Sequence, residues 1–286
     1  MIAPVFFIKK KDGFLWLVQN YHALNSKMIK NIYPLPFISN LINHLWGAHY
    51  FIKLDVRWGY NNVHIKEDDE WKAAFHTNRR LFEPLVMFFS LTNSPATFQT
   101  MMNNIFQDLI SEGVICVYLD NILIFTETME EYDWVTCLVL EQLQQYKLYL
   151  RHDKCEFSQT KIEYLGLIIS HGQVEINSVK IARVAEWPTP GSKKEVQSFL
   201  GFTNFYCCFI QGFSNLAQPL FDLTWNNSDW HWEAVEWSAF ETICKCVVSR
   251  RQLRFCHWSD PLTAVSIRQH VASNCLLFQE SQCHGM

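Results

Sequence analysis

The chain has 286 residues, of which 49% are hydrophobic and 15% aromatic, and its formal net charge is -4. This length suits one large domain or two of ordinary size, with a substantial core. The acidic balance is not typical of proteins that bind nucleic acid, although such binding depends on the local field at a groove.

The first segments predict a hairpin, an extended link and a short helix. Residues 3–25 carry apolar runs on both sides of a "KDG" turn, which is a strong signal for two paired strands. Residues 33–38, "YPLPFI", are stiffened by two prolines and predict an extended link. Residues 39–48 predict a helix between a serine cap and a glycine stop.

The middle of the chain predicts a mixture of strands and helices. Residues 51–56 predict a strand, and the acidic run at residues 67–70 predicts a solvated turn. A helix is expected after Pro95, because apolar residues recur at helical spacing as far as Ile110. The following segments predict a strand-turn-strand unit, a helix and a strand, at residues 114–128, 130–150 and 161–170.

Two prolines and a glycine within residues 186–196 mark a boundary. Beyond them, Ser192 and Glu195 form a capping-box pattern, which predicts a helical segment as far as about Thr224. From Trp225 onward the order of elements is harder to read, and the tail "CLLFQESQCHGM" has no clean period.

The cysteines favour a reduced, intracellular protein. No secretory signal precedes them, so we expect a cytoplasmic or nuclear location and no secretion. No apolar run approaches the roughly 20 residues of a membrane helix, and no membrane partner is expected. A zinc site is the alternative, although no C-x2-C pair has its partner among Cys244, Cys246, Cys256, His257, Cys283 and His284.

Two acidic residues end strongly apolar strands, Asp55 in "IKLDV" and Asp120 in "VYLDN". A carboxylate at such a position costs desolvation unless it is paired, protonated or bound to a cation. A tight turn at Asp120 and Asn121 would explain the second of them without any function. Two such acids, on strands far apart in the sequence, favour a site where both bind one divalent cation, since Mg²⁺ prefers carboxylate oxygens.

Motifs along nearly the whole chain carry a family resemblance. In chain order they are "APVFFIKKKDG", "LNSKMIKNIYPLP", "YFIKLDVRWGYNNVHIKEDDEWKAAF", "LVMFFSLTNSPATFQTMMNNIF", "VYLDNILIFT", "LRHDKCEFSQTKIEYLGLIIS" and "EWPTPGSKKEVQSFLGFTNFY". In this order and spacing the chain resembles the reverse transcriptase region of Ty3/gypsy-type LTR retrotransposon polyproteins.

The resemblance implies an α+β right-hand polymerase with fingers, an antiparallel-sheet palm and a helical thumb. Its expected boundaries are fingers at 1–45 and 71–90, palm at 46–70 and 91–170, a mostly helical thumb or connection at 171–225, and a truncated, degenerate RNase H-like segment at 226–286. The implied activity is DNA synthesis from dNTPs on a primed RNA or DNA template. Two Mg²⁺ ions, for which Mn²⁺ is a possible substitute, would assist nucleotidyl transfer to the primer 3′-hydroxyl.

The same resemblance assigns roles to particular residues. Asp55 and Asp120 match the family's metal-binding carboxylates, and Asn121 occupies a third, degenerate catalytic position. The residues that match the nucleotide site are Lys9, Lys10, Lys11, Tyr60, Phe89 and Gln99. Leu165 and Gly166 match the hairpin that grips the primer end.

Each of these assignments has a structural alternative. Tyr60 is also explained as a core aromatic residue and Phe89 as a packing residue. The lysines are also explained as a solvated turn.

Several positions depart from the family pattern. Asn121 replaces the second acid of a Tyr-x-Asp-Asp motif, so it keeps the shape but loses a charge. Trp16 replaces an arginine that grips the triphosphate and provides no charged fork. The other departures are Asn20 and His22 in the fingers, Ser90 for a glycine, and Cys207 and Cys208 for two thumb arginines. We interpret the chain as a truncated, degenerate copy whose activity is weakened.

The last segment resembles the opening of an RNase H domain, whose first catalytic aspartate falls on Ile267. No RNase H activity is therefore expected. Two alternatives to a polymerase stay open, namely a non-catalytic nucleic-acid-binding remnant and a non-functional relic that folds poorly.

Overall fold

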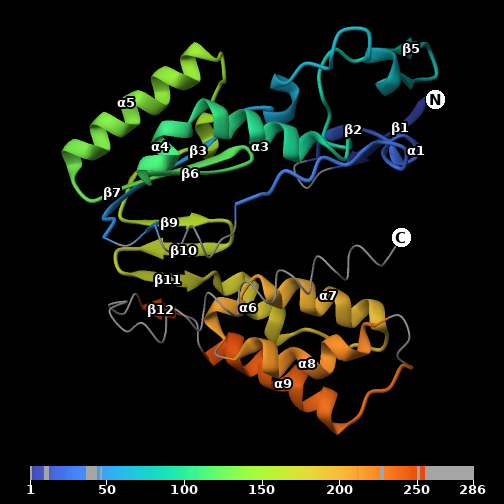
Figure 1. The fold of residues 1–286 in the computed structure, drawn as a ribbon, viewed down its shortest axis with the longest axis vertical. Coiled ribbons are helices and arrows are strands. Elements are labelled where there is room, and N and C mark those ends of the chain that lie inside the picture. The colour runs from blue at the N-terminus through green and yellow to red at the C-terminus, as the bar shows by residue number, and fades with distance from the viewer. Residues whose placement is uncertain are drawn as a thin grey trace. The chain divides into compact units, whose positions relative to one another are not determined.

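The computed structural model describes residues 2–9, 13–36, 44–45, 47–210, 212–225, 229–249 and 252–254. The chain divides into two units, one formed by residues 1–44 and 48–160 and the other by residues 45–47 and 161–286 (Figure 1). The first unit contains most of the predicted fingers and palm. The second begins at Lys161, ahead of the predicted end of the palm at residue 170. The boundaries between fingers, palm and thumb remain predictions.

The first unit opens with the predicted hairpin. β1 (Ala3–Lys9) pairs antiparallel with β2 (Leu15–Gln19), in a register that runs from Val5 opposite Gln19 to Lys9 opposite Leu15. This sheet has the order β2-β1-β4-β5, and its other strands are β4 (Phe75–His76) and β5 (Leu81–Phe82). The short helix α1 (His22–Asn25) follows the hairpin.

A second sheet in the same unit has the order β6-β7-β3-β8. Its strands, which all pair antiparallel with their neighbours, are β3 (Tyr50–Asp55), β6 (Ile115–Tyr118), β7 (Asn121–Thr126) and β8 (Glu156–Gln159). The strand and the strand-turn-strand unit predicted for this region are confirmed. Because side chains alternate along a strand, one face of β3 and β7 is apolar and the other carries Asp55 and Asn121.

Helices cover the apolar face of this sheet. They are α3 (Ser94–Ile105), α4 (Gln107–Glu112) and α5 (Met129–Gln145). Ile52 and Ile124 from the sheet share one core with Phe98 and Met102 from α3, and all four side chains are at most 1% exposed. The helix predicted after Pro95 is confirmed, with a break at Phe106 that separates α3 from α4.

Short 3-10 turns join these elements. They are η1 (Gly59–Asn62), η2 (Glu70–Ala73) and η3 (His152–Lys154). The acidic run at residues 67–70 lies in turn structure, as predicted. The helix predicted at residues 39–48 falls largely outside the described residues.

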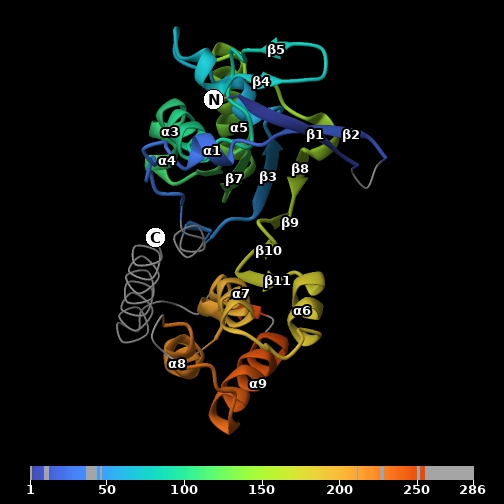
Figure 2. The same cartoon turned by 90° about the vertical axis from the view of Figure 1, so that its right-hand side faces the viewer.

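The second unit combines a four-stranded sheet with helices (Figure 2). The sheet has the order β12-β11-β10-β9, with β9 (Lys161–Tyr164), β10 (Leu167–Ser170), β11 (Gln173–Ile176) and β12 (Gln252–Arg254). The prediction of one strand over residues 161–170 was therefore wrong, because Leu165 and Gly166 turn the chain between two strands.

The helices of this unit are α6 (Ser178–Ala185), α7 (Lys193–Asn204), α8 (Phe213–Leu223) and α9 (Ala234–Ser249), with the turn η4 (Cys207–Phe209). The Ser192 cap predicted at the start of α7 is confirmed, but the reciprocal bond of a capping box is not, because Glu195 reaches the amide of Gly191 instead of that of Ser192. The Ser192 side chain accepts from the Glu195 amide, and the Glu195 carboxylate accepts from the Gly191 amide at 2.7 Å. The helical segment to Thr224 is also confirmed.

Helix α9 lies within the predicted RNase H-like segment, and it packs against the other helices of the second unit. Its Phe240 ring lies 4.7 Å from that of Phe199 in α7. The rest of that prediction concerns residues 255–286, including Ile267, which lie outside the described residues. Over the described ranges, no helix combines the length and the apolar character needed to cross a membrane.

Candidate active site

A two-residue hairpin places Asp120 beside the end of β3. Tyr118 pairs with Asn121 across the hairpin, and Asn121 in turn pairs with Asp55. The turn is therefore Leu119-Asp120, with Leu119 at a positive φ of 54°. This differs by one residue from the alternative turn at Asp120-Asn121, since Asn121 is the first residue of β7.

The backbone ties the hairpin to the strand that carries the first acid. The amide of Val56 donates to the carbonyl of Asp120 at 2.7 Å. Gly59 allows close approach on the other side, because a Cβ there would lie 3.3 Å from the Asp120 Cβ and 3.2 Å from the Phe98 ring. The two predicted metal ligands thus lie at one edge of the sheet, Asp55 at the end of β3 and Asp120 in the turn before β7.

Asp55 is 6% exposed and has two cationic neighbours. Arg151 Nε lies 3.1 Å from Asp55 Oδ1, and Lys154 Nζ lies 3.8 Å from Oδ2. The contact between the Arg151 guanidinium and Asp55 Oδ1 is an ion pair without hydrogen-bond alignment. Oδ1 is buried, and it accepts no hydrogen bond from the described residues. Sequence reasoning missed both basic residues, although they stand in the quoted motif "LRHDKCEF".

Asp120 is more easily protonated than an ordinary aspartate. Burial is the main cause that raises the pKa of its carboxyl group, and the negative charge of Asp55 adds to the effect. Its own backbone amide and the charges of Arg151 and Lys154 act in the opposite direction. The Asn121 side-chain amide donates to Asp120 Oδ1 at 3.2 Å, so it supplies a neutral contact where an acid would repel.

These residues fit a hard divalent cation. Asp55 at the end of β3 and Asp120 in the adjacent turn provide carboxylate oxygens, and the buried Asp55 Oδ1 has no hydrogen-bond donor among the described residues. Asn121 can add only a neutral amide oxygen. In the described part of the chain, no group of three or more His, Cys, Asp or Glu side chains gathers in a metal-binding arrangement, so two acids are what this site offers.

Aromatic side chains form a row next to the acids. The Tyr60 ring lies 4.7 Å from Phe89 and 5.7 Å from Phe98, and Trp16 meets Phe89 edge-on at 6.0 Å. Tyr60 is 9% exposed, and burial raises the pKa of its hydroxyl, with Asp120 adding to the effect. Phe89 is 50% exposed, so much of its ring is accessible, whereas Tyr60 belongs to the core.

Gln99 lies under the hairpin, where it has no exposed surface. Its amide nitrogen donates to the Val117 carbonyl at 3.0 Å and to Asn103 Oδ1 at 2.8 Å. Its oxygen accepts from the Leu119 amide at 2.8 Å. In this structure the predicted nucleotide-site residue positions the turn that carries Asp120.

The other predicted residues lie at strand ends. Lys9 is exposed at the end of β1, opposite Leu15, while Lys10 and Lys11 lie outside the described residues. In the second unit, Leu165 and Gly166 form the two-residue turn between β9 and β10, with φ values of 53° and 82°. The hairpin expected for a primer grip is present, and its contact with a primer remains a prediction.

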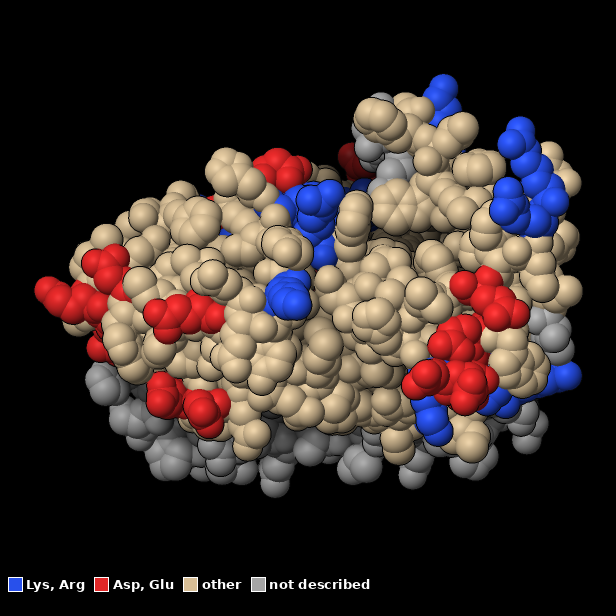
Figure 3. Space-filling model, turned by 90° about the horizontal axis from the view of Figure 1, so that it is seen from above, with Lys and Arg blue, Asp and Glu red and all other residues tan. Residues whose placement is uncertain are grey.

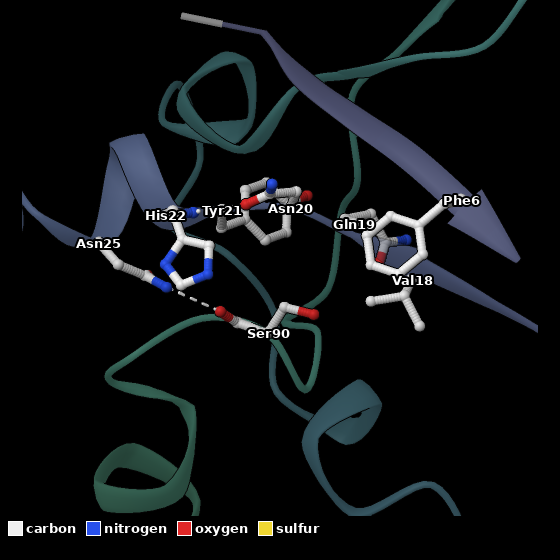
Figure 4. Close-up of a pocket in the computed structure, with 8 residues that line it drawn as sticks. All are labelled: Phe6, Val18, Gln19, Asn20, Tyr21, His22, Asn25 and Ser90. Atoms are coloured by element: carbon white, nitrogen blue, oxygen red, sulfur yellow. Dashed lines mark hydrogen bonds between the residues drawn. The ribbon is translucent and has the colours of Figure 1, made fainter. Parts of the chain in front are cut away.

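A pocket of about 230 Å³ lies where the β1-β2 hairpin meets the loop at Ser90 (Figure 4). Asn25 closes one side, because its side-chain amide donates to the Ser90 carbonyl at 2.9 Å. Gln19 lines the pocket with an amide nitrogen that is buried and has no hydrogen-bond partner among the described residues. The lining residues are Phe6, Val18, Gln19, Asn20, Tyr21, His22, Asn25 and Ser90. Three of the departures from the family pattern therefore meet in one place, which sequence spacing did not indicate.

Charge is dispersed on the face seen in Figure 3. The Lys and Arg side chains form several separate groups, with Asp and Glu side chains between and beside them. This distribution agrees with the formal net charge of -4, and it provides local basic groups rather than one continuous basic stripe.

Comparison with known proteins gives concordant matches. A family model described as reverse transcriptase (RNA-dependent DNA polymerase) matches residues 8–169. The transposon Tf2-7 and Tf2-3 polyproteins of Schizosaccharomyces pombe are each 34% identical to the chain over 278 residues. The match covers 97% of the chain but 21% of each polyprotein, so the chain spans about a fifth of these relatives.

Two solved structures of a foamy viral protease-reverse transcriptase share the fold. One, in complex with dsDNA, has a TM-score of 0.73 at 23% identity, and covers 91% of this chain and 54% of that chain. The other, in complex with an RNA/DNA hybrid, has a TM-score of 0.71 at 22% identity, and covers 89% and 34%. With Asp55 at the end of β3, Asp120 in the turn before β7, and the family match over residues 8–169, the chain belongs to the reverse transcriptase family and corresponds to that region of a retrotransposon polyprotein.

Proposed function

We propose that this chain is an RNA-directed DNA polymerase module whose activity is weakened by its own substitutions. The observation that supports it most is the pairing of Asp55 with Asn121, which brings Asp55 and Asp120 together at the end of two strands. A carboxylate pair in a reverse transcriptase fold, with Asp55 buried and Asp120 half-buried, suits metal-assisted nucleotidyl transfer.

Asp55 and Asp120 would hold Mg²⁺, and Mn²⁺ could replace it. When bound, the two ions would activate the primer 3′-hydroxyl and neutralise charge on the leaving pyrophosphate. The protein's own part is to hold the two carboxylates rigidly. Gln99 fixes the turn beneath Asp120, and the Val56 amide holds the Asp120 carbonyl against β3.

The nucleotide would lie against the exposed Phe89 ring and near Tyr60. The Phe89 ring is half-exposed, and the Tyr60 ring packs against it. Tyr60 matches the family's aromatic residue that disfavours ribonucleotides. Lys9, Lys10 and Lys11 match the family's basic turn near the triphosphate. We propose dNTPs and a primed RNA or DNA template as partners, since solved reverse transcriptases with this fold hold dsDNA or an RNA/DNA hybrid. We place the activity in the cytoplasm or nucleus.

The weakening follows from charge. A unit charge pair at about 4 Å is worth a few kcal/mol at an effective dielectric near 20. Losing about half of that at Asn121 would slow the reaction roughly 30-fold. Trp16 adds to the loss, because its indole donates no charged fork to a phosphate.

Primer extension tests the proposal. Incorporation of dNTPs should be measured on a primed RNA template with Mg²⁺ and with Mn²⁺, for the chain and for Asp55→Asn. We expect slow incorporation that Asp55→Asn lowers at least about 100-fold, because it removes the buried carboxylate of the pair. Incorporation that survives Asp55→Asn would contradict the assignment. An exposed matched control is Asp133→Asn in α5.

A second function is favoured by the neutral Asn121, namely a nucleic-acid-binding protein without turnover. It predicts duplex binding that weakens with salt, together with no incorporation by either the natural chain or Asn121→Asp.

A further inference from the structure

The segment that follows α5 delivers two cations to the buried acid. Leu150 forms a bridge with Val56, directly after Asp55, and the amide of Arg57 donates to the Tyr149 carbonyl at 2.7 Å. The Arg151 amide then donates to the Asp55 carbonyl at 2.8 Å. The backbone of this segment is therefore anchored on both sides of the residue whose guanidinium approaches the carboxylate.

The next turn fixes Arg151 further. The amide of Lys154 donates to the Arg151 carbonyl at 3.0 Å, and the Cys155 thiol donates to the same carbonyl at 3.3 Å. The Arg151 side chain is 35% exposed and lies 3.1 Å from Asp55 Oδ1, whereas Lys154 is 51% exposed and lies 3.8 Å from Oδ2. Arg151 is thus the better placed of the two cations.

The charge balance of the site is unusual for a place that would bind metal. Asp55 and Asp120 contribute two negative charges, Arg151 and Lys154 contribute two positive charges, and Asn121 contributes none. With an acid at position 121 the sum would be negative. In this chain the charges of these side chains add to zero, so a divalent cation gains little from long-range attraction. The cation would also meet a positive side chain already at the Asp55 carboxylate.

We propose that Arg151 is an internal counter-ion for Asp55 that competes with the divalent ion and sets its affinity. The inference rests on the proposed metal site at Asp55 and Asp120. Arg151 approaches Oδ1, the buried oxygen that accepts no hydrogen bond from the described residues, so its guanidinium would compete for that oxygen with an ion that Asp55 holds. The side chain must swing away before the ion is held.

Direct Mn²⁺ binding tests this. The metal-free protein should be titrated with Mn²⁺ at fixed ionic strength, and free Mn²⁺ followed by electron paramagnetic resonance. We expect Arg151→Gln to tighten Mn²⁺ binding about tenfold, since one opposing charge near the site is removed. Arg183→Gln removes an exposed arginine from α6 and should leave the affinity unchanged within about twofold. Affinity of Arg151→Gln that equals or falls below that of the natural chain would overturn the inference.

Further variants separate this inference from the metal site itself. Arg151→Lys keeps the charge, so its affinity should return toward that of the natural chain. Lys154→Gln should shift the affinity in the same direction by a smaller factor, which gives a second test if Arg151→Gln folds poorly. In the Arg151→Gln background, Asp55→Asn should abolish the tightened binding. Mn²⁺ binding that persists without Asp55 would defeat the proposed metal site, whereas loss with Asp55→Asn but no gain with Arg151→Gln would defeat the counter-ion alone.

Discussion

At the scale of single residues, the Asp120 carboxyl group lies where burial and a second acid disfavour its charge. The same neighbourhood supplies Arg151 and Lys154, which act against that effect without reversing it. Because its pKa is raised, this carboxyl group loses its proton most readily when a cation binds beside it. The stability of the metal-free protein should therefore depend on pH through this residue.

The first prediction concerns that dependence. The folded chain keeps the Asp120 proton to a higher pH than the unfolded chain, whose carboxyl has the ordinary pKa of 3.8. The folded state thus binds more protons across this window, and Asp120 makes the free energy of unfolding fall as pH rises from 3.8 to the raised pKa. Urea unfolding in a chelator should therefore show a more negative slope of the unfolding free energy against pH in the natural chain than in Asp120→Asn. An unchanged slope in Asp120→Asn, with Asp133→Asn as control, would contradict the assignment.

The second prediction concerns Gln99. Gln99→Leu leaves the Val117 carbonyl and the Leu119 amide without their partner, and should lower the free energy of unfolding by about 3 kcal/mol. Gln144→Leu, on an exposed position of α5, should change it by less than about 0.5 kcal/mol. Equal small losses in urea unfolding would show that Gln99 does not position the turn.

The residues differ in how far sequence could predict them. Asp55 and Asp120 could be found, because acids in apolar strands and a motif order single them out. The turn itself could not be placed to the residue, since Leu119 takes a positive φ that leucine disfavours, while Asp and Asn favour turns. The contacts of Arg151 and Gln99 depend on segments far apart in the chain, which no local pattern records.

At the scale of elements, local signals worked where they were strong. The hairpin of β1 and β2 and the Ser192 cap of α7 follow from turn and cap chemistry that a few residues define. The β9-β10 turn was missed as an element boundary, because Leu165 precedes the single glycine and interrupts no apolar run. Helix α9 was missed because its exposed Trp237 and other apolar residues blur the helical period.

The third prediction belongs to α7. Ser192→Ala removes the side chain that accepts from the Glu195 amide, and should lower the free energy of unfolding of the second unit by about 1 kcal/mol. The matched control is Ser198→Ala, an exposed serine inside the same helix whose hydroxyl donates to the Lys194 carbonyl. Its effect should stay within about 0.5 kcal/mol. Denaturant unfolding followed by circular dichroism compares the two, and losses of equal size would contradict the cap.

At the scale of the whole molecule, the fold tolerates substitution better than the charge of the site does. The core beneath the site is built from apolar residues of β3, β7, α3 and α5, and none of the departures from the family pattern enters it. Asn121 keeps its place in the ladder opposite Asp55, because an amide has nearly the shape of a carboxylate. The fold can therefore persist although one of the charges of the proposed metal site is lost.

The measurement that tests this account most directly is primer extension with Asn121→Asp beside the natural chain, on a primed RNA template with Mg²⁺. The restored carboxylate should raise the rate of dNTP incorporation roughly 30-fold. Asn104→Asp adds the same charge at an exposed position of α3 and should leave the rate unchanged. No incorporation by either chain, with the RNA/DNA duplex still bound by both, would contradict the polymerase assignment and favour the binding protein.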